Sequence, residues 1–376
     1  MGSASCYHLA GRGLKVLGLE QFNIVHERGS HSGQSRIIRK AYFEHTDYVP
    51  LLERAYHNWN QIEQQSGAKV YYQTGIVYFG DREDEIMAGV RNAAALYNLP
   101  LQSLSGEESG ARFSQFQIPK NFETLFEPDA GFITPERAIR MYSEQATRHG
   151  ARIRENTKVI HWKVAGTGVE VVTDHDSYTC DKLVITAGSW TSKLVPDQGN
   201  KLAVTRQMLA WVHPENPDSF RLGNFPCWFI QDPSMGLFYG FPLLSEKEFG
   251  GPPGIKIAHH QRGDAWDPDN TDRVVPPGTL VNIRHVLQKY LPVAGEDISF
   301  TQQCLYTYSP DSNFIIDHLP GTNKRVSIAC GFSGHGFKFV SVVGEILADL
   351  ATRGSTDLPI DFLRLQRFQT ISGKLK

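Results

Sequence analysis

A strand, a glycine-rich loop and a helix follow one another near the end of this 376-residue chain, and this succession most constrains the fold. The apolar run at 325–329 predicts a strand, and the pattern from about 340 to 350 predicts a helix. Three glycines in the loop between them, at 330–339, allow the backbone to approach a flat, polar ligand closely. The N–H groups at the start of the helix favour negative charge at the same place.

The beginning of the chain predicts the second half of a dinucleotide-binding βαβ unit. Residues 2–13 read as a helix rich in small residues, and residues 15–20 read as a short buried strand that ends in Glu20. In such a unit the terminal acid holds the ribose hydroxyls, and Gly2 would be the third glycine of G-x-G-x-x-G. We expect the first strand of the fold to be missing from this sequence. An incomplete record of a longer protein is the interpretation we favour over a form that binds its cofactor poorly.

Segments of two kinds alternate along the chain. Residues 182–190 predict a buried strand with Gly188 at its carboxyl end, where doubly wound folds often place a nucleotide. Helices are expected at 48–66, 84–97 and 135–149 and a strand at 74–80, and residues 207–308 are rich in predicted strands. We therefore expect a mixed α/β fold of two interleaved domains. Residues 1–71, 137–206 and 311–376 form the nucleotide-binding domain, and residues 72–136 and 207–310 form a strand-rich substrate domain.

Composition excludes several classes of protein. The net charge of −2 predicts neither a nucleic-acid surface nor a polybasic membrane anchor, and no apolar run reaches the roughly 18 residues of a membrane span. The first residues lack the basic and apolar regions of a signal peptide. Five scattered cysteines without a C-x-x-C pair favour a reducing cytoplasm, and the histidines form no metal-ligand motif. We expect a cytoplasmic monomer without a metal.

Five segments recur, in the same order, in one family of flavoenzymes: residues 29–42, 239–242, 254–260, 304–317 and 331–339. On these segments the chain resembles the family of monomeric sarcosine oxidase, N-methyltryptophan oxidase and pipecolate oxidase. These are FAD-dependent amine oxidases with a glutathione-reductase-like flavin fold. The resemblance covers nearly the whole chain, and five ordered segments are far more specific than any single motif.

The resemblance implies FAD as the cofactor, joined to Cys304 by a thioether at the flavin 8α-methyl group. From composition alone, Cys304 reads as an ordinary cysteine of the protein core. The residues that we expect to contact FAD are Gly2, Glu20, Ser35, Arg36, Gly188, Cys304, Tyr306, Gly331, Gly334, His335, Gly336, Phe337 and Lys338.

The resemblance also assigns cations to two steps. Lys256 matches a lysine above the flavin that promotes the reaction with oxygen, because a fixed cation stabilises developing superoxide charge. By itself, a lysine in an apolar strand indicates an edge or a snorkelling side chain. Arg39 and Lys338 match the pair that binds the substrate carboxylate, and a salt bridge within its own segment is the alternative for Arg39.

Three further residues are catalytic candidates by the same resemblance. Arg36 would lie over the flavin, His260 near the substrate amine and Tyr239 in the active site. Each is equally consistent with a structural role, since a single titratable group in a strand is weak evidence of function.

The resemblance implies oxidation of an N-methyl or cyclic amino acid to an imine, which yields an aldehyde and an amine, with oxygen reduced to hydrogen peroxide. The partners are then an amino-acid substrate and oxygen. Alternatives are a fructosyl amino acid or pipecolate substrate on the same scaffold, a dehydrogenase that passes electrons to a protein, and a non-catalytic nucleotide-binding remnant.

Overall fold

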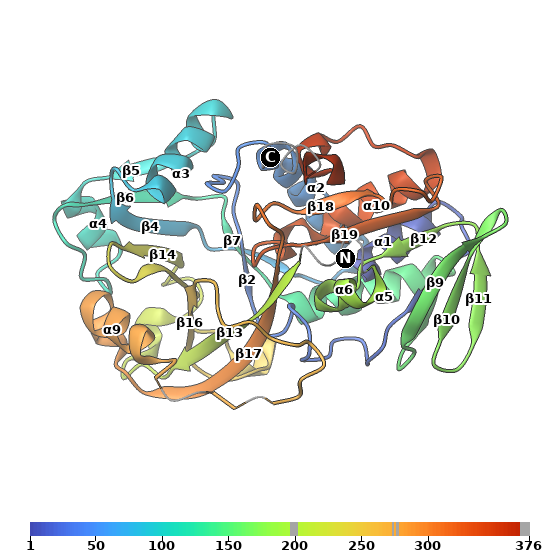
Figure 1. Cartoon of the computed structure of the whole chain (residues 1–376). Coiled ribbons are helices and arrows are strands. Elements are labelled where there is room, and N and C mark those ends of the chain that lie inside the picture. The colour runs from blue at the N-terminus through green and yellow to red at the C-terminus, as the bar shows by residue number, and fades with distance from the viewer. Residues whose placement is uncertain (196–201, 273, 276–277, 369–376) are drawn as a thin grey trace, which may run out of the picture.

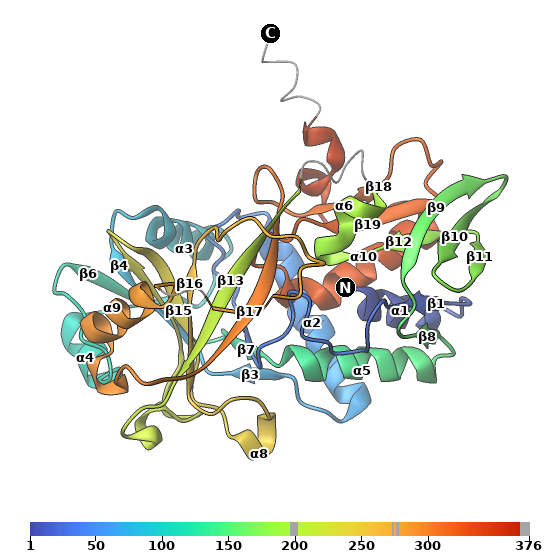
Figure 2. The ribbon, with the colours of Figure 1, turned by 60° about the horizontal axis from the view of Figure 1, so that its bottom comes forward.

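The computed structural model describes residues 1–195, 202–272, 274–275 and 278–368 (Figure 1). It has a mixed α/β fold, as the sequence predicts. One half, on the left of Figure 1, is built around a large sheet, and the other contains the long helices and several short strands. The strands β13 and β17 reach from the large sheet toward the helix-rich half (Figure 2).

The helix-rich half is built around a core that four helices share with a small sheet. The helices are α1 (Gly2–Gly11), α2 (Tyr48–Ser66), α5 (Pro135–Arg148) and α10 (Val340–Arg353). The sheet has the order β12-β19-β18, with β12 at Leu183–Ile185, β19 at Val326–Cys330 and β18 at Ile315–His318. Helix α2 buries Leu52, Ala55, Trp59 and Ile62 at helical spacing, and it ends where Gly67 takes a left-handed conformation.

The large sheet has eight strands in the order β17-β13-β16-β15-β14-β4-β6-β5, of which only β14 and β4 pair in parallel. The bounds are β4 (Ile76–Asp81), β5 (Gln102–Leu104), β6 (Phe122–Glu127), β13 (Ala203–Val212), β14 (Cys227–Asp232), β15 (Gly236–Gly240), β16 (Ile255–His260) and β17 (Ile298–Tyr308). One face packs in an apolar cluster with α9 (Val281–Tyr290). The opposite face turns toward the segments that carry the candidate site.

Short strands complete the structure. Strands β2 (Arg36–Ile38) and β3 (Tyr71–Gln73) both pair with β7 (Gly131–Ile133). Strands β9 (Val159–Ala165), β10 (Gly168–Thr173) and β11 (Ser177–Cys180) form an antiparallel meander, at the right of Figure 1. The other α-helices of the described residues are α3 (Glu85–Leu96), α4 (Gly106–Arg112), α6 (Thr191–Leu194) and α8 (Glu246–Phe249).

The helices expected at 48–66, 84–97 and 135–149 are confirmed as α2, α3 and α5, and those expected at the two ends are α1 and α10. The prediction of a buried strand at 15–20 is wrong in its extent and burial. Strand β1 covers only Leu17–Leu19, pairs in parallel with β8 (Arg152–Arg154), and leaves Leu17 38% exposed. Among the described residues β8 is its sole strand partner, so its other edge remains open. Strand β12 is likewise shorter than predicted, because a 3-10 turn begins at Gly188.

Candidate active site

A large cavity, of about 1560 Å³, is lined by residues of both halves. Pockets for small ligands usually measure roughly 300–1,000 Å³, so this one has room for a dinucleotide and a small substrate together. Most predicted site residues line it, namely Gly2, Glu20, Arg36, Arg39, Gly188, Tyr239, His260, Tyr306, Gly331, Gly334, His335, Gly336, Phe337 and Lys338. Three do not line it: Ser35, Lys256 and Cys304.

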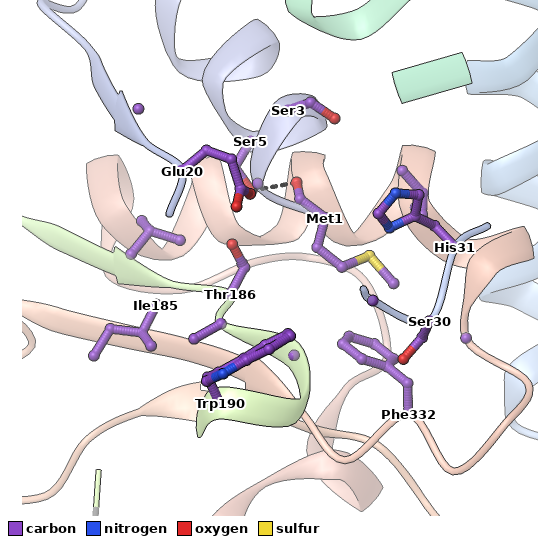
Figure 3. Close-up of a pocket in the computed structure, with 18 of the residues that line it drawn as sticks. Met1, Ser3, Ser5, Glu20, Ser30, His31, Ile185, Thr186, Trp190 and Phe332 are labelled. Carbon is purple, nitrogen blue, oxygen red and sulfur yellow. Dashed lines mark hydrogen bonds between the residues drawn. The ribbon is translucent and has the colours of Figure 1, made fainter. Parts of the chain in front are cut away.

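The end of the cavity next to α1 is shown in Figure 3. Glu20 directly follows β1, and its Oε1 accepts a hydrogen bond of 3.0 Å from the Phe22 N–H. Burial raises the pKa of Glu20. Gly2 begins α1 so close to the end of β12 that an added Cβ would lie 2.9 Å from Thr186 Oγ1. The predicted helix, strand and acid therefore meet at one end of the cavity.

Strand alternation places five predicted residues on one face of the large sheet. The pairing registers align Tyr239 of β15 with Ala258 of β16, and Lys256 and His260 lie two residues to either side of Ala258. Cys304 and Tyr306 alternate in the same way on β17, and the hydroxyls of Tyr239 and Tyr306 are 3.3 Å apart. His259 takes the opposite face, where its ring stacks on Phe238.

Lys256 is buried beneath the loop that precedes β2. Its Nζ donates hydrogen bonds of 2.7 Å to the Gly33 carbonyl and 2.5 Å to the Ser35 carbonyl, and it lies 4.1 Å from the centre of the Phe241 ring. Burial lowers the pKa of Lys256 well below its ordinary value, and the nearby charge of Arg36 lowers it further. The lysine is therefore held by backbone carbonyls, and no carboxylate bonds to it among the described residues.

Cys304 is 1% exposed and pairs in register with Gln207 of β13. Burial raises the pKa of its thiol, whereas the charges of Arg36 and Lys256 act to lower it. A cysteine becomes a nucleophile as the thiolate, so the two cations are the groups that would favour a reaction at its sulfur.

Arg39 is 1% exposed and forms an ion pair with Glu44. Its Nη2 donates to both carboxylate oxygens of Glu44 at 2.8 and 2.6 Å, and its Nη1 donates to the Ala41 carbonyl at 2.8 Å. Burial would lower the pKa of Arg39, but Glu44, Tyr78 and Tyr42 together outweigh it, and the pKa lies above its ordinary value. The salt bridge considered from the sequence is thus present. Glu44 also lines the cavity.

Lys338 lines the same cavity, nearly 300 residues later in the chain. Its Nζ donates to the His335 carbonyl at 3.0 Å, and burial together with Arg39 lowers its pKa to about 7, against the opposing attraction of Glu44. Burial also lowers the pKa of His335 to about 3 and that of His260 to about 4, so both imidazoles are neutral near pH 7. The pair Arg39 and Lys338 therefore forms a cationic region beside two neutral histidines.

The glycines of the loop after β19 are required by aromatic neighbours. An added Cβ would lie 2.4 Å from the Tyr306 ring at Gly334 and 2.5 Å from Phe332 at Gly336, and both Gly331 and Gly334 have positive φ. The loop thus packs tightly on rings of the protein and also lines the cavity. The sequence predicted the close backbone approach but not these partners.

Buried polar atoms without partners gather in the segment that leads into and follows β2. Among the described residues, His31 Nε2, Ser32 Oγ, Ser35 Oγ and Arg39 Nε have no hydrogen-bond partner. Buried polar groups are normally satisfied, and because His31 and Arg39 line the cavity whereas Ser32 and Ser35 do not, the nitrogens of His31 and Arg39 are the atoms that suit a bound polar ligand. With the acid at one end of the cavity and two cations at the other, the residues present fit FAD and a small carboxylate.

Three acids near the site were not singled out from the sequence. Glu44 pairs with Arg39, while Glu127 and Glu136 accept hydrogen bonds from backbone N–H groups on either side of β2. Glu44 follows Arg39 by five residues, a spacing that could have suggested an ion pair. Glu127 and Glu136 are separated from their backbone partners by about 90 to 100 residues in the sequence, so no local pattern predicts these hydrogen bonds.

A family model described as FAD dependent oxidoreductase matches residues 1–350 of the chain. The chain is 36% identical to monomeric sarcosine oxidase of Streptomyces avermitilis over 361 residues, which cover 96% of this chain and 93% of that protein. It is 32% identical to N-methyl-L-tryptophan oxidase of Yersinia pestis over 375 residues, covering 98% and 97%.

Solved structures share the fold. NikD, an unusual amino acid oxidase essential for nikkomycin biosynthesis, has a TM-score of 0.83 at 24% identity over 96% of this chain and 94% of its own. L-proline dehydrogenase from P. horikoshii has a TM-score of 0.82 at 22% identity over 100% and 96%. Within the described residues, no helix is both long and apolar enough to cross a membrane.

Proposed function

The chain belongs to the family of FAD dependent oxidoreductases, and on this premise we propose that it oxidises secondary amino acids of the N-methyl or cyclic type. One observation carries the proposal: Arg39, Lys338, His260 and Tyr239 line the same cavity as the acid and glycines expected to hold FAD. A carboxylate and an adjacent amine would therefore be bound beside the flavin.

The residues divide the binding of FAD between the two ends of the cavity. Glu20 would accept hydrogen bonds from the ribose hydroxyls. Gly2 and Gly188 would allow the protein backbone to approach the nucleotide closely. The loop 331–338 would lie against the ring, and Cys304 would hold the ring covalently. When bound, FAD supplies the redox chemistry, taking a hydride from the carbon next to the substrate nitrogen and passing two electrons to oxygen, which gives hydrogen peroxide.

The substrate is bound and oriented by the chain itself. Arg39 would bind the carboxylate through its guanidinium fork, and Lys338 would add a second charge. Two cations beside the carboxylate also favour loss of the proton from the substrate amine. The neutral imidazole of His260 could accept that proton, with Tyr239 as a neighbouring donor. The oxidised product is an imine, which water hydrolyses to an aldehyde and an amine.

Lys256 would act on the step with oxygen, and Arg36 would lie over the flavin. Lys256 is a buried cation candidate fixed by two carbonyls, so it needs no reorganisation when negative charge develops on oxygen. This supports an oxidase over a dehydrogenase with a protein acceptor, although the proline dehydrogenase shares the fold.

The proposed organisation keeps the two interleaved domains, 1–71, 137–206 and 311–376 for FAD and 72–136 and 207–310 for substrate. Residues 196–201, 273, 276–277 and 369–376 of these ranges lie outside the described part. We also propose a cytoplasmic monomer. All five cysteines are unpaired, as a reducing compartment would leave them.

The test is turnover of the purified, FAD-loaded protein. Sarcosine, N-methyl-L-tryptophan, L-pipecolate and a fructosyl amino acid are each supplied in air, and hydrogen peroxide is measured with a coupled peroxidase. We expect peroxide in proportion to the aldehyde or cyclic imine formed. Turnover that needs an artificial electron acceptor, without peroxide, would identify a dehydrogenase. Protein that binds no flavin and oxidises none of the four would refute the proposal.

A further inference from the structure

Strand β2 joins the segment that holds Lys256 to the segment that carries Arg39. The loop before it, at Gly33 to Ser35, holds Lys256, and Arg39 follows it directly. Strand β2 pairs antiparallel with β7, with Arg36 opposite Ile133 and Ile38 opposite Gly131 (Figure 1). Because the pairing is antiparallel, the chain after β7 reaches the start of β2 and the chain before β7 reaches its end.

Glu136 follows β7 and binds the start of β2. Its Oε1 accepts hydrogen bonds from the Gly33 N–H at 2.7 Å and the Gln34 N–H at 3.1 Å. Gly33 and Gln34 have φ values of 107° and 70°, a conformation that a non-glycine residue keeps only with outside support. The N–H groups of this turn face Glu136, while the carbonyls of Gly33 and Ser35 accept from Lys256.

Glu127 precedes β7 and binds the end of β2. It is 1% exposed, and its Oε1 accepts from the Lys40 N–H. Its Oε2 accepts from the Ala41 N–H at 3.3 Å and from the Tyr78 hydroxyl at 2.8 Å. Ala41 in turn accepts a hydrogen bond from Arg39 Nη1 through its carbonyl. Glu127 therefore fixes the backbone on the N-terminal side of Ala41, the residue whose carbonyl orients the Arg39 guanidinium.

We propose that Glu136 and Glu127 are positioning residues for two different steps, Glu136 for the oxygen step through Lys256 and Glu127 for carboxylate binding through Arg39. The proposal rests on the functions proposed for Lys256 and Arg39. Each carboxylate fixes backbone on one side of β2 only, so its removal disturbs one cation and spares the other. Two carboxylates that merely stabilised the fold would not separate the steps in this way.

The two carboxylates differ in how many oxygens they use, which predicts different effects of amide substitution. Glu136 uses one oxygen for both of its bonds, so the single amide oxygen of Glu136→Gln can accept both, and only the charge, which raises the pKa of Lys256, is lost. Glu127 uses both oxygens, and in Glu127→Gln one of them becomes an NH₂ group that faces donors. Rescue by glutamine is therefore expected at 136 and not at 127.

The experiment uses the FAD-loaded enzyme and three measurements: flavin reduction by substrate without oxygen, reoxidation by oxygen, and the Kd of propionate from the flavin spectrum. Glu136→Ala should slow reoxidation about tenfold and leave the Kd within about twofold, and Glu136→Gln should restore reoxidation. Glu127→Ala should raise the Kd about tenfold and leave reoxidation within about twofold. Glu127→Gln should also raise the Kd. If Glu127→Ala does not fold, the Kd of Glu127→Gln tests the role of Glu127 in carboxylate binding.

Glu345→Gln is the matched control, because Glu345 accepts from Arg54 and Asn58 between α2 and α10, outside the site. It should change thermal stability and none of the three measurements. The proposal is overturned if Glu136→Ala and Glu127→Ala change reoxidation and the Kd by the same factors. It is also overturned if Glu136→Ala leaves reoxidation unchanged and Glu127→Ala leaves the Kd unchanged. Lys256→Met and Arg39→Met report on the proposed function: if they affect their steps and the glutamate variants do not, only the positioning roles fail. If Lys256→Met leaves reoxidation unchanged, the oxygen role and the Glu136 arm fall together.

Discussion

Arg39 and Glu44 form an ion pair between a buried guanidinium and a half-buried carboxylate at the wall of the cavity, with one guanidinium nitrogen within 2.8 Å of both carboxylate oxygens. Burial would raise the pKa of Glu44, but Arg39 lowers it to about 2, so Glu44 is ionised at neutral pH. A substrate carboxylate must therefore share Arg39 with Glu44 or displace it, which makes the affinity for carboxylates a direct probe of this pair.

Arg39→Met should weaken the binding of carboxylates that lack an amine, such as propionate, by about 1.5–3 kcal/mol, the scale of a hydrogen bond to a charged group. Titration of the flavin spectrum measures the Kd. Arg54→Met, which breaks a more exposed ion pair with Glu345 outside the cavity, is the control and should leave the Kd unchanged. An unchanged affinity in Arg39→Met would remove the carboxylate clamp and with it the amino-acid substrate class.

The same binding should depend on pH through Lys338. Its pKa is lowered to about 7, mainly by burial, so the amine is charged below that pH and neutral above it. The Kd of propionate should therefore rise as the pH increases through about 7, by about tenfold if one charged hydrogen bond is lost. His260 and His335 titrate near 4 and 3 and do not contribute in this window. A Lys338→Met variant with the same pH profile as the parent would contradict the assignment.

Lys256→Met should slow reoxidation of the flavin by oxygen far more than its reduction by substrate. Removing one preorganised group that stabilises developing charge typically costs about 10²–10³ in rate. Rapid mixing of reduced enzyme with oxygen, and of oxidised enzyme with substrate under nitrogen, separates the two steps. Equal losses in both would count against a role in the oxygen step.

Cys304→Ala should abolish covalent attachment of the flavin. The parent protein, precipitated with acid, should give a yellow pellet, and the variant should leave its flavin in the supernatant. Cys227→Ala, which removes another buried thiol from the same sheet, is the control and should keep the yellow pellet. Colour retained by the Cys304→Ala pellet would show that another residue carries the link.

Gly334→Ala tests the packing of the glycine loop independently of catalysis. A methyl group there meets the Tyr306 ring at 2.4 Å, and the residue has a φ of 86°. Overpacking and left-handed strain together should lower the free energy of unfolding by about 2–5 kcal/mol. Gly67→Ala has a similar φ of 72° but open space around it, so it should lose only about 1–2 kcal/mol. Thermal unfolding compares them, and equal losses would mean that the contact with Tyr306 is unimportant.

The sequence by itself determined the elements whose pattern is local. The periodic apolar residues of α2 predict a helix at 48–66, and the helix has these bounds. It ends where Gly67 takes a left-handed conformation. Adjacent residues in a strand face opposite sides, and His259 and His260 do so in β16. The burial of β1 was not predictable in this way, because it depends on which strands pair with each edge.

Only the tertiary structure decided the partners of the charged groups. Lys256 could be read as an edge lysine, and its carbonyl partners at Gly33 and Ser35 lie more than 200 residues away in the sequence. Glu127 and Glu136 reach β2 because β7 pairs with it in one particular register. Hydrogen-bond partners of this kind follow from strand pairing across the whole fold. Helical period and strand alternation are properties of neighbouring residues, so a sequence pattern reveals them but does not reveal the distant partners.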